Sequence, residues 1–142
     1  MTAIGFSGSR KGCSPAQLVW LEEALRIDVL MGVTELHHGD CVGADEVAHD
    51  LALNFGIKIV VHPPVDPKYR AYCTGINVEV REPKEYKARD RDIVRETAAL
   101  YATPEGLEVN YPRSGTWYTV RWAATLNRII SYCLPNGEWG NY

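Results

Sequence analysis

The sequence lacks the features that mark membrane, secreted and zinc-finger proteins. No apolar run in its 142 residues approaches the ~18 residues that a membrane span needs. The N-terminus has no charged segment ahead of an apolar one, so we predict no signal peptide and a cytoplasmic location. The cysteines, Cys13, Cys41, Cys73 and Cys133, form no Cys-x-x-Cys pair and stand at no zinc-finger spacing from a histidine. We therefore expect reduced thiols, no metal and no cofactor.

The sequence also contains no block of basic residues. Its formal net charge is −3, whereas proteins that bind duplex DNA or RNA usually carry a basic stripe. The composition therefore argues against a nucleic-acid partner. Single arginines remain available to hold a small anion.

What the sequence does contain is an alternation of short β-rich runs and helical stretches. Helices are predicted between Ser14 and Gly32, from Asp45 to Gly56, and over 86–97 and 114–127. Strands are predicted over 4–7, 35–38, 57–62, 98–103 and 129–134, and residues 65–85 have no clear period. The pattern predicts a single domain over residues 1–142, with a Rossmann-like three-layer α/β/α fold and a mostly parallel five-stranded sheet.

Three turns after predicted strands carry the residues with binding chemistry. Ligands of such sheets bind outside the carboxyl ends of the strands. The turn Gly8-Ser9-Arg10 and the turn Arg113-Ser114-Gly115-Thr116 combine glycine, hydroxyl groups and arginine, which suit a phosphate group. Each turn is also compatible with an ordinary βα connection, and Ser114 or Thr116 with a simple N-cap.

The third turn runs from Gly39 to Asp45 and opens a helix whose free amides attract anions. It is neither a full dinucleotide fingerprint nor a Walker A loop. Asp45 is interpreted as the N-cap of the next helix. Asp40 has no such structural role in the sequence, so we interpret it as a contact for a ribose hydroxyl, a base edge or a metal ion.

Two further positions extend this predicted site. Arg89 lies near the start of a helix with a mixed run of charges, which is either a solvated face or a group leaning over the ligand. His62 ends a strand beside Pro63, whereas His37, His38 and His49 are interpreted as structural. Arg89 and Asp40 are the candidate catalytic residues. The predicted ligand-binding residues are Gly8, Ser9, Arg10, Gly39, Asp40, Gly43, Ala44, Asp45, His62, Pro63, Arg89, Arg113, Ser114, Gly115, Thr116 and Trp117, the last as a stacking surface for a base.

At these turns the sequence resembles the SLOG superfamily, which includes LOG-type enzymes, DprA-like domains and YspA/YpsA-like proteins. The similarity spans about residues 4–134 and is greatest to the YspA-like branch. It rests on Gly8-Ser9-Arg10, on His38-Gly39-Asp40 through Gly43-Ala44-Asp45, on residues 89–94 and on Ser114-Gly115-Thr116. The resemblance implies a Rossmann-like fold that binds nucleotides or nucleotide-derived ligands.

The resemblance carries over less of the catalytic machinery. LOG-type enzymes hydrolyse the base–ribose bond of nucleoside monophosphates with an arginine and a glutamate. Counted along the chain, Arg89 matches that arginine, whereas Thr119 stands where the glutamate is expected. Residues 105–113 also interrupt the family's glycine-rich loop. A threonine does not act as a carboxylate acid or base at neutral pH.

The sequence therefore leaves open whether the ligand is only bound or also hydrolysed. One hypothesis is a sensor, carrier or sequestering protein for a nucleotide such as an ADP-ribose-like molecule, in nucleotide-signalling defence or counter-defence. The alternative is a nucleotide N-glycosidase in which Asp40, Asp45 or Glu105 replaces the lost carboxylate. The LOG-type resemblance also implies a homo-oligomer, a dimer or higher.

Overall fold

The chain forms a seven-stranded sheet in the order β4-β3-β2-β1-β5-β6-β7. The structure is a computed structural model, and it describes residues 2–142. The strands are β1 (Ala3–Gly8), β2 (Glu35–His38), β3 (Lys58–Val61), β4 (Val78–Val80), β5 (Ala99–Thr103), β6 (Ile129–Cys133) and β7 (Trp139–Asn141). All neighbouring strands pair in parallel except β6 and β7. The predicted α/β class is confirmed, and the predicted number of five strands is wrong because β4 and β7 extend the two edges.

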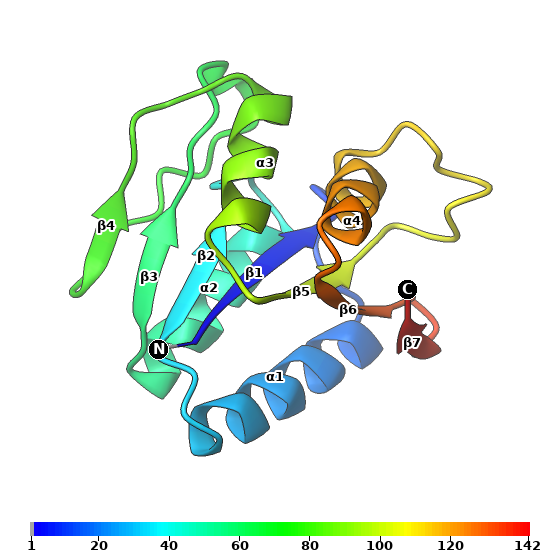
Figure 1. Cartoon of the computed structure of the whole chain (residues 1–142), viewed down its shortest axis with the longest axis horizontal. Coiled ribbons are helices and arrows are strands. Elements are labelled where there is room, and N and C mark those ends of the chain that lie inside the picture. Colours follow the sequence, from blue (N-terminus) through cyan, green and yellow to red (C-terminus); the bar gives the residue numbers. More distant parts are fainter. Residues whose placement is uncertain (1) are drawn as a thin grey trace.

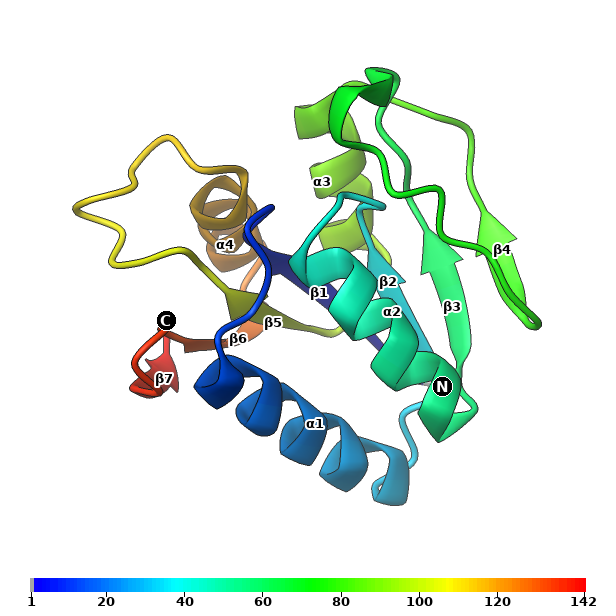
Figure 2. The ribbon, with the colours of Figure 1, turned by 180° about the vertical axis from the view of Figure 1, so that it is seen from behind.

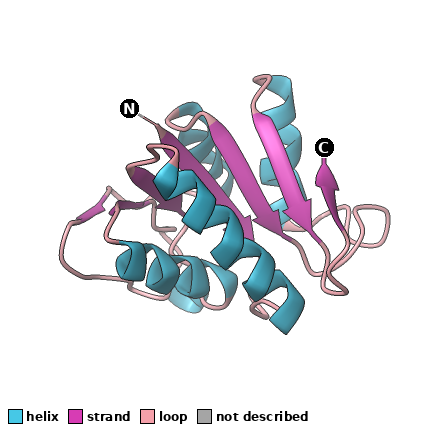
Figure 3. Ribbon diagram, turned by 90° about the horizontal axis from the view of Figure 1, so that it is seen from below, coloured by secondary structure: helices cyan, strands magenta, loops and turns pink. Residues whose placement is uncertain are grey.

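Helices cover both faces of this sheet, as Figures 1 and 2 show from opposite sides. The helices are α1 (Pro15–Leu30), α2 (Ala44–Phe55), α3 (Tyr86–Arg95) and α4 (Gly115–Thr125), with a short 3-10 helix, η1 (Pro67–Tyr69). Helix α1 packs beside α2 on one face, and α3 packs beside α4 on the other. Figure 3 shows the strands between these two helical layers. The predicted three-layer arrangement is therefore present.

The helix boundaries follow from local capping signals. Ser14 and Gln17 form a reciprocal capping box at the start of α1, with Pro15 in the first turn. Helix α2 ends at Gly56, whose φ of 71° is left-handed and favours glycine. Both boundaries agree with the sequence prediction. None of the helices in residues 2–142 combines the length and apolarity that a transmembrane segment requires.

Two apolar clusters fill the space between the sheet and its helices. The larger cluster includes Phe6, Leu25 and Ile59 beneath α1 and α2. The smaller one includes Leu100 and Val120 beneath α4. Burying large apolar side chains on both faces fixes the sheet and holds its edge of loops in place.

The topology places a switch point between β1 and β5. Strands β2, β3 and β4 follow β1 on one side of it, and the chain then returns through α3 to β5 on the other side, so the strand order reverses here. Ligands of open parallel sheets bind at the carboxyl ends of the strands beside such a point. Residues 104–114, drawn in yellow in Figure 1, leave β5 at this edge and project away from the layers.

Candidate functional site

The turn after β1 packs directly against the start of α2. The Ala44 amide donates a hydrogen bond of 2.9 Å to the Ser9 carbonyl. Gly43 has a φ of 96°, and a Cβ there would lie 2.3 Å from the Arg10 carbonyl oxygen. A Cβ on Gly8 would lie 2.5 Å from the Ala44 Cβ. The two glycines are therefore required by protein packing, which brings the first two predicted turns together.

Arg89 lies buried beneath the carboxyl ends of β2 and β3. Its guanidinium donates to the Gly39 carbonyl and, at 3.2 Å, to the His62 carbonyl. It also pairs with Asp90 and lies 3.4 Å from the Cys41 Sγ. Only 7% of Arg89 is exposed. Arg89 therefore ties together the segments that follow β2 and β3. Its role toward a ligand stays a prediction.

Asp45 is a buried carboxyl group beside this arginine. Its Oδ2 accepts a hydrogen bond of 3.1 Å from the Cys41 amide. Burial raises the pKa of Asp45 to about 7, and the Arg89 charge opposes that rise. The interpretation of Asp45 as an N-cap is wrong, because Gly43 occupies the cap and Asp45 lies inside the first turn of α2. A carboxyl with this pKa can hold or release a proton near neutral pH.

Asp40 is fully buried and has partners within the chain. Its carboxylate accepts hydrogen bonds from Arg70 Nε at 3.0 Å and from the Cys73 amide at 2.8 Å. Its carbonyl accepts a further bond from the Ala71 amide. The expectation that Asp40 has no structural role is therefore wrong. Both carboxylate oxygens hold the segment 70–73 against the end of β2, and the predicted ribose or metal contact of Asp40 stays a prediction.

The third predicted turn begins α4. The Ser114 hydroxyl accepts a hydrogen bond of 3.1 Å from the Trp117 amide, so Ser114 is the N-cap. Gly115 borders open space, since a Cβ there would meet no atom within 4 Å. Thr116 is buried and Arg113 is exposed. In this turn Gly115 and the exposed side chain of Arg113 therefore face the solvent.

Trp117 is buried and does not lie at the protein surface. Only 3% of the residue is exposed, its Nε1 donates to the Gly106 carbonyl at 2.9 Å, and its ring packs on Tyr132. The prediction that a base stacks on Trp117 disagrees with this packing. Its helical spacing is equally typical of a core position, which is where the structure places it.

Helix α3, which carries Arg89, packs against α4. Burial raises the pKa of Asp90, and Arg89 and the nearby Thr119 side chain oppose that rise. The Thr119 hydroxyl donates a bond of 2.8 Å to the Gly115 carbonyl. Asp90 was not predicted as a site residue. The only sequence feature that points to Asp90 is its position next to Arg89, and a solvent-exposed run of mixed charges has the same appearance.

The remaining predicted positions lie at the end of β3. His62 and Pro63 are both buried, and the Pro63 carbonyl accepts a hydrogen bond of 3.1 Å from the Lys84 amide. The His62 side chain lines a small pocket of about 210 Å³ together with Arg89 and Asp92. The structure thus joins the first two turns directly and reaches the third through Arg89, Asp90 and Thr119.

This arrangement is a Rossmann-like α/β fold, and comparison with solved structures finds the same fold in other proteins. The molybdenum cofactor binding protein from Rippkaea orientalis superposes with a TM-score of 0.68 at 20% identity, over 94% of this chain and 76% of that one. The protein TM1055 gives 0.63 at 16% identity, over 92% and 72%. DNA processing protein A (DprA) from Streptococcus pneumoniae gives 0.66 at 21% identity, over 92% of this chain and 49% of its own length.

At these identities the comparisons establish the fold. The chain spans about half the length of DprA and about three quarters of the other two proteins. No protein-family model matches the sequence, and no curated protein matches it either. The predicted Rossmann-like fold is confirmed.

Proposed function

We propose that this protein binds a phosphate-bearing nucleotide or a nucleotide-derived small molecule at the carboxyl edge of its sheet. The observation that supports the proposal most is the contrast among three glycines at this edge. Protein atoms crowd Gly8 and Gly43, whereas Gly115 borders open space at the first turn of α4. The first amides of a helix have no partner within the helix and attract anions. The phosphate is therefore proposed to lie against Gly115 and Thr116.

Cationic side chains around this edge suit the same ligand. Arg10 and Arg113 are exposed, in the turns that follow β1 and β5. The Arg10 guanidinium lies 4.0 Å from the centre of the Tyr69 ring, which holds it over the edge of the sheet. Arginine binds phosphate through two parallel hydrogen bonds. The printed name of one structural neighbour, a molybdenum cofactor binding protein, is in keeping with a small-molecule ligand here.

The test begins with the ligand itself. Mass spectrometry of small molecules that co-purify with the protein would identify a nucleotide, and calorimetry with AMP, ADP-ribose and inorganic phosphate would rank affinities. Gly115→Ala is the informative variant, because its methyl group meets no protein atom and would collide only with a ligand on the amides. We expect it and Arg113→Ala to weaken binding about tenfold or more, the loss of roughly one charge-assisted hydrogen bond.

Arg26→Ala is the matched control for charge removal. Arg26 lies on α1 and pairs with Glu22 and Glu23, away from the carboxyl edge. The Arg26→Ala variant should bind the ligand with the same affinity as the unmodified protein. Unchanged affinity in both Gly115→Ala and Arg113→Ala would remove the support for this placement.

A second candidate function, nucleotide N-glycosidase, is favoured by two buried acids. Asp45 has a pKa of about 7, and Asp90 contacts Thr119, where the resemblance places a glutamate. Either group is a candidate for protonating a leaving base. Incubation with nucleoside monophosphates would release free base if this holds. Loss of that release in both Asp45→Asn and Asp90→Asn, with AMP binding retained, would assign the acids to hydrolysis.

We also propose that the protein forms the predicted homo-oligomer. Light scattering coupled to gel filtration measures the mass directly. A mass near 15.9 kDa would identify a monomer and contradict the prediction.

A further inference from the structure

Two histidine pairs lie on opposite faces of the sheet. His37 Nδ1 and His62 Nε2 are 2.8 Å apart on the α3 side, and His38 Nε2 and His49 Nδ1 are 2.9 Å apart on the α2 side. Each pair has a third potential metal ligand within 4.8 Å. It is Glu96 for the first pair, which we name the His62 cluster, and Cys73 for the second, which we name the His49 cluster.

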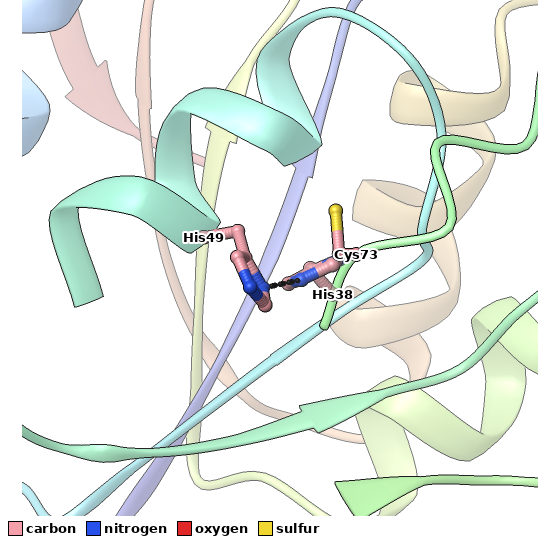
Figure 4. A group of neighbouring side chains, drawn as sticks. All are labelled: His38, His49 and Cys73. Atoms are coloured by element: carbon pink, nitrogen blue, oxygen red, sulfur yellow. Dashed lines mark hydrogen bonds between the residues drawn. The ribbon is translucent and has the colours of Figure 1, made fainter. Parts of the chain in front are cut away.

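Hydrogen bonds decide the proton positions in the His49 cluster. The Asp40 amide donates to His38 Nδ1 at 2.9 Å, and His49 Nε2 faces the Thr74 carbonyl at 2.9 Å. His38 must therefore carry its proton on Nε2, where it donates to His49. A neutral imidazole that accepts at Nδ1 has no lone pair left at Nε2 for a metal. Figure 4 also shows the Cys73 sulfur directed away from the two rings.

The His62 cluster has the opposite arrangement. His37 Nε2 lies 2.7 Å from a Glu35 carboxylate oxygen, so this nitrogen carries the proton. That leaves the His37 Nδ1 lone pair directed at His62. Carboxylates that fix the outer nitrogen of a histidine are typical of metal sites. In the present contact His62 Nε2 donates to this lone pair, and once that proton moves to Nδ1, His62 Nε2 offers its own lone pair, so both imidazoles can then face one ion.

The surroundings of the His62 cluster supply a third ligand and a neighbouring pocket. Glu96 ends α3 and is one-third exposed, with one carboxylate oxygen 2.7 Å from Arg81 Nη2. Arg81 also pairs with Glu79, which retains it if Glu96 turns to an ion. Of the three ligands only His62 lines the neighbouring pocket of about 210 Å³, whose other lining residues are Arg81, Glu82, Lys84, Arg89 and Asp92. Burial lowers the pKa of His37, and it lowers that of His62 to about 3, so both rings are neutral at physiological pH.

We propose that His37, His62 and Glu96 bind a divalent transition-metal ion, with zinc as the best match, and that Glu35 orients His37. Two imidazoles and one carboxylate suit zinc rather than magnesium or calcium. Zinc at ~2.0–2.1 Å from each nitrogen sets them about 3.3 Å apart in tetrahedral geometry. The two nitrogens need to separate by about half an ångström from their present contact, and both rings must turn so that their lone pairs point at the ion rather than along the line between the nitrogens. The remaining position is left for water, as in a catalytic site.

The experiment is calorimetric titration of the metal-free protein with zinc, followed by visible spectroscopy with cobalt(II). We expect one equivalent of zinc to bind, and an excess of magnesium not to compete. Glu96→Gln and Glu35→Gln should each weaken zinc binding by roughly 10–100-fold, the range seen when a metal's supporting groups are removed. Glu79→Gln is the matched control, because Glu79 also pairs with Arg81 but is not a ligand.

Several outcomes would overturn the proposal. The first is an absence of zinc binding, and the second is equal zinc affinity in Glu96→Gln and Glu79→Gln. A thiolate-to-cobalt charge-transfer band that disappears in Cys73→Ala would instead assign the metal to the His49 cluster. Glu96 is at the surface, so its variant tests the site even where replacing the buried His62 prevents folding. None of these measurements uses a nucleotide, so the result is independent of the proposed function.

Discussion

Replacing Asp45 by asparagine should stabilise the protein, and more so at high pH. Asp45 has a pKa of about 7 in the folded chain against 3.8 as its ordinary value. The folded state therefore binds more protons than the unfolded state between about pH 4 and pH 7, and stability falls as the pH rises through that window. A pKa difference of about 3 corresponds to about 4 kcal/mol, at 1.36 kcal/mol for each pKa unit.

The assay is urea unfolding of both proteins at pH 5 and pH 8. Asparagine keeps an oxygen that can accept from the Cys41 amide but carries no charge. We expect the advantage of Asp45→Asn to be about 2–3 kcal/mol larger at pH 8 than at pH 5, because about two of the three pKa units lie above pH 5. Taking the difference between variant and parent cancels the titration of the buried histidines.

Asp50→Asn provides the control, since Asp50 lies exposed on the same helix. Its effect on stability should not change between the two pH values. Equal stability gains for Asp45→Asn at pH 5 and pH 8 would refute the assignment of a strongly raised pKa to this carboxyl group.

Three further predictions concern stability. Arg89→Ala should cost about 3–5 kcal/mol in urea unfolding, because it leaves a buried Asp90 unpaired; a cost below about 1 kcal/mol would contradict this. Gly43→Ala should lower the melting temperature through its left-handed φ and the clash with the Arg10 carbonyl, and an unchanged melting temperature would show that the turn relaxes. Trp117→Ala should cost about 3–5 kcal/mol as a core truncation, measured by denaturant unfolding, whereas an exposed stacking residue would cost little.

The parts of the fold that the sequence predicted are those specified locally. Ser14, Pro15 and Gln17 mark the start of α1 by short-range hydrogen bonds, and Gly56 ends α2 by its backbone conformation. The β-branched run that begins at Ile57 forms strand β3 as predicted. These features need no information from distant residues.

The missing strands lie at the edges of the sheet and are short. Strands β4 and β7 have three residues each, too few for an alternating pattern to stand out from a loop. Their pairing depends on β3 and β6 being in place already. Tertiary context, rather than local preference, makes these segments extended.

The candidate site was predictable as a set of turns but not as a set of roles. Asp40 and Asp45 differ in the structure because one meets Arg70 and the other is buried beside Arg89. Neither partner is visible from sequence spacing. The same holds for His37 and His62, which are 25 residues apart and share a hydrogen bond.

The adjacent histidines of β2 have a consequence for how that strand is seated. Successive side chains of a strand point to opposite faces, so His37 meets His62 on one side while His38 meets His49 on the other. A slip of β2 by one position would exchange the two rings and strand polar nitrogens in both helical layers. Leu36 is the one aliphatic side chain of β2, so the two imidazoles specify much of its register. A chain folded with β2 out of register would lose hydrogen bonds on both faces of the sheet at once.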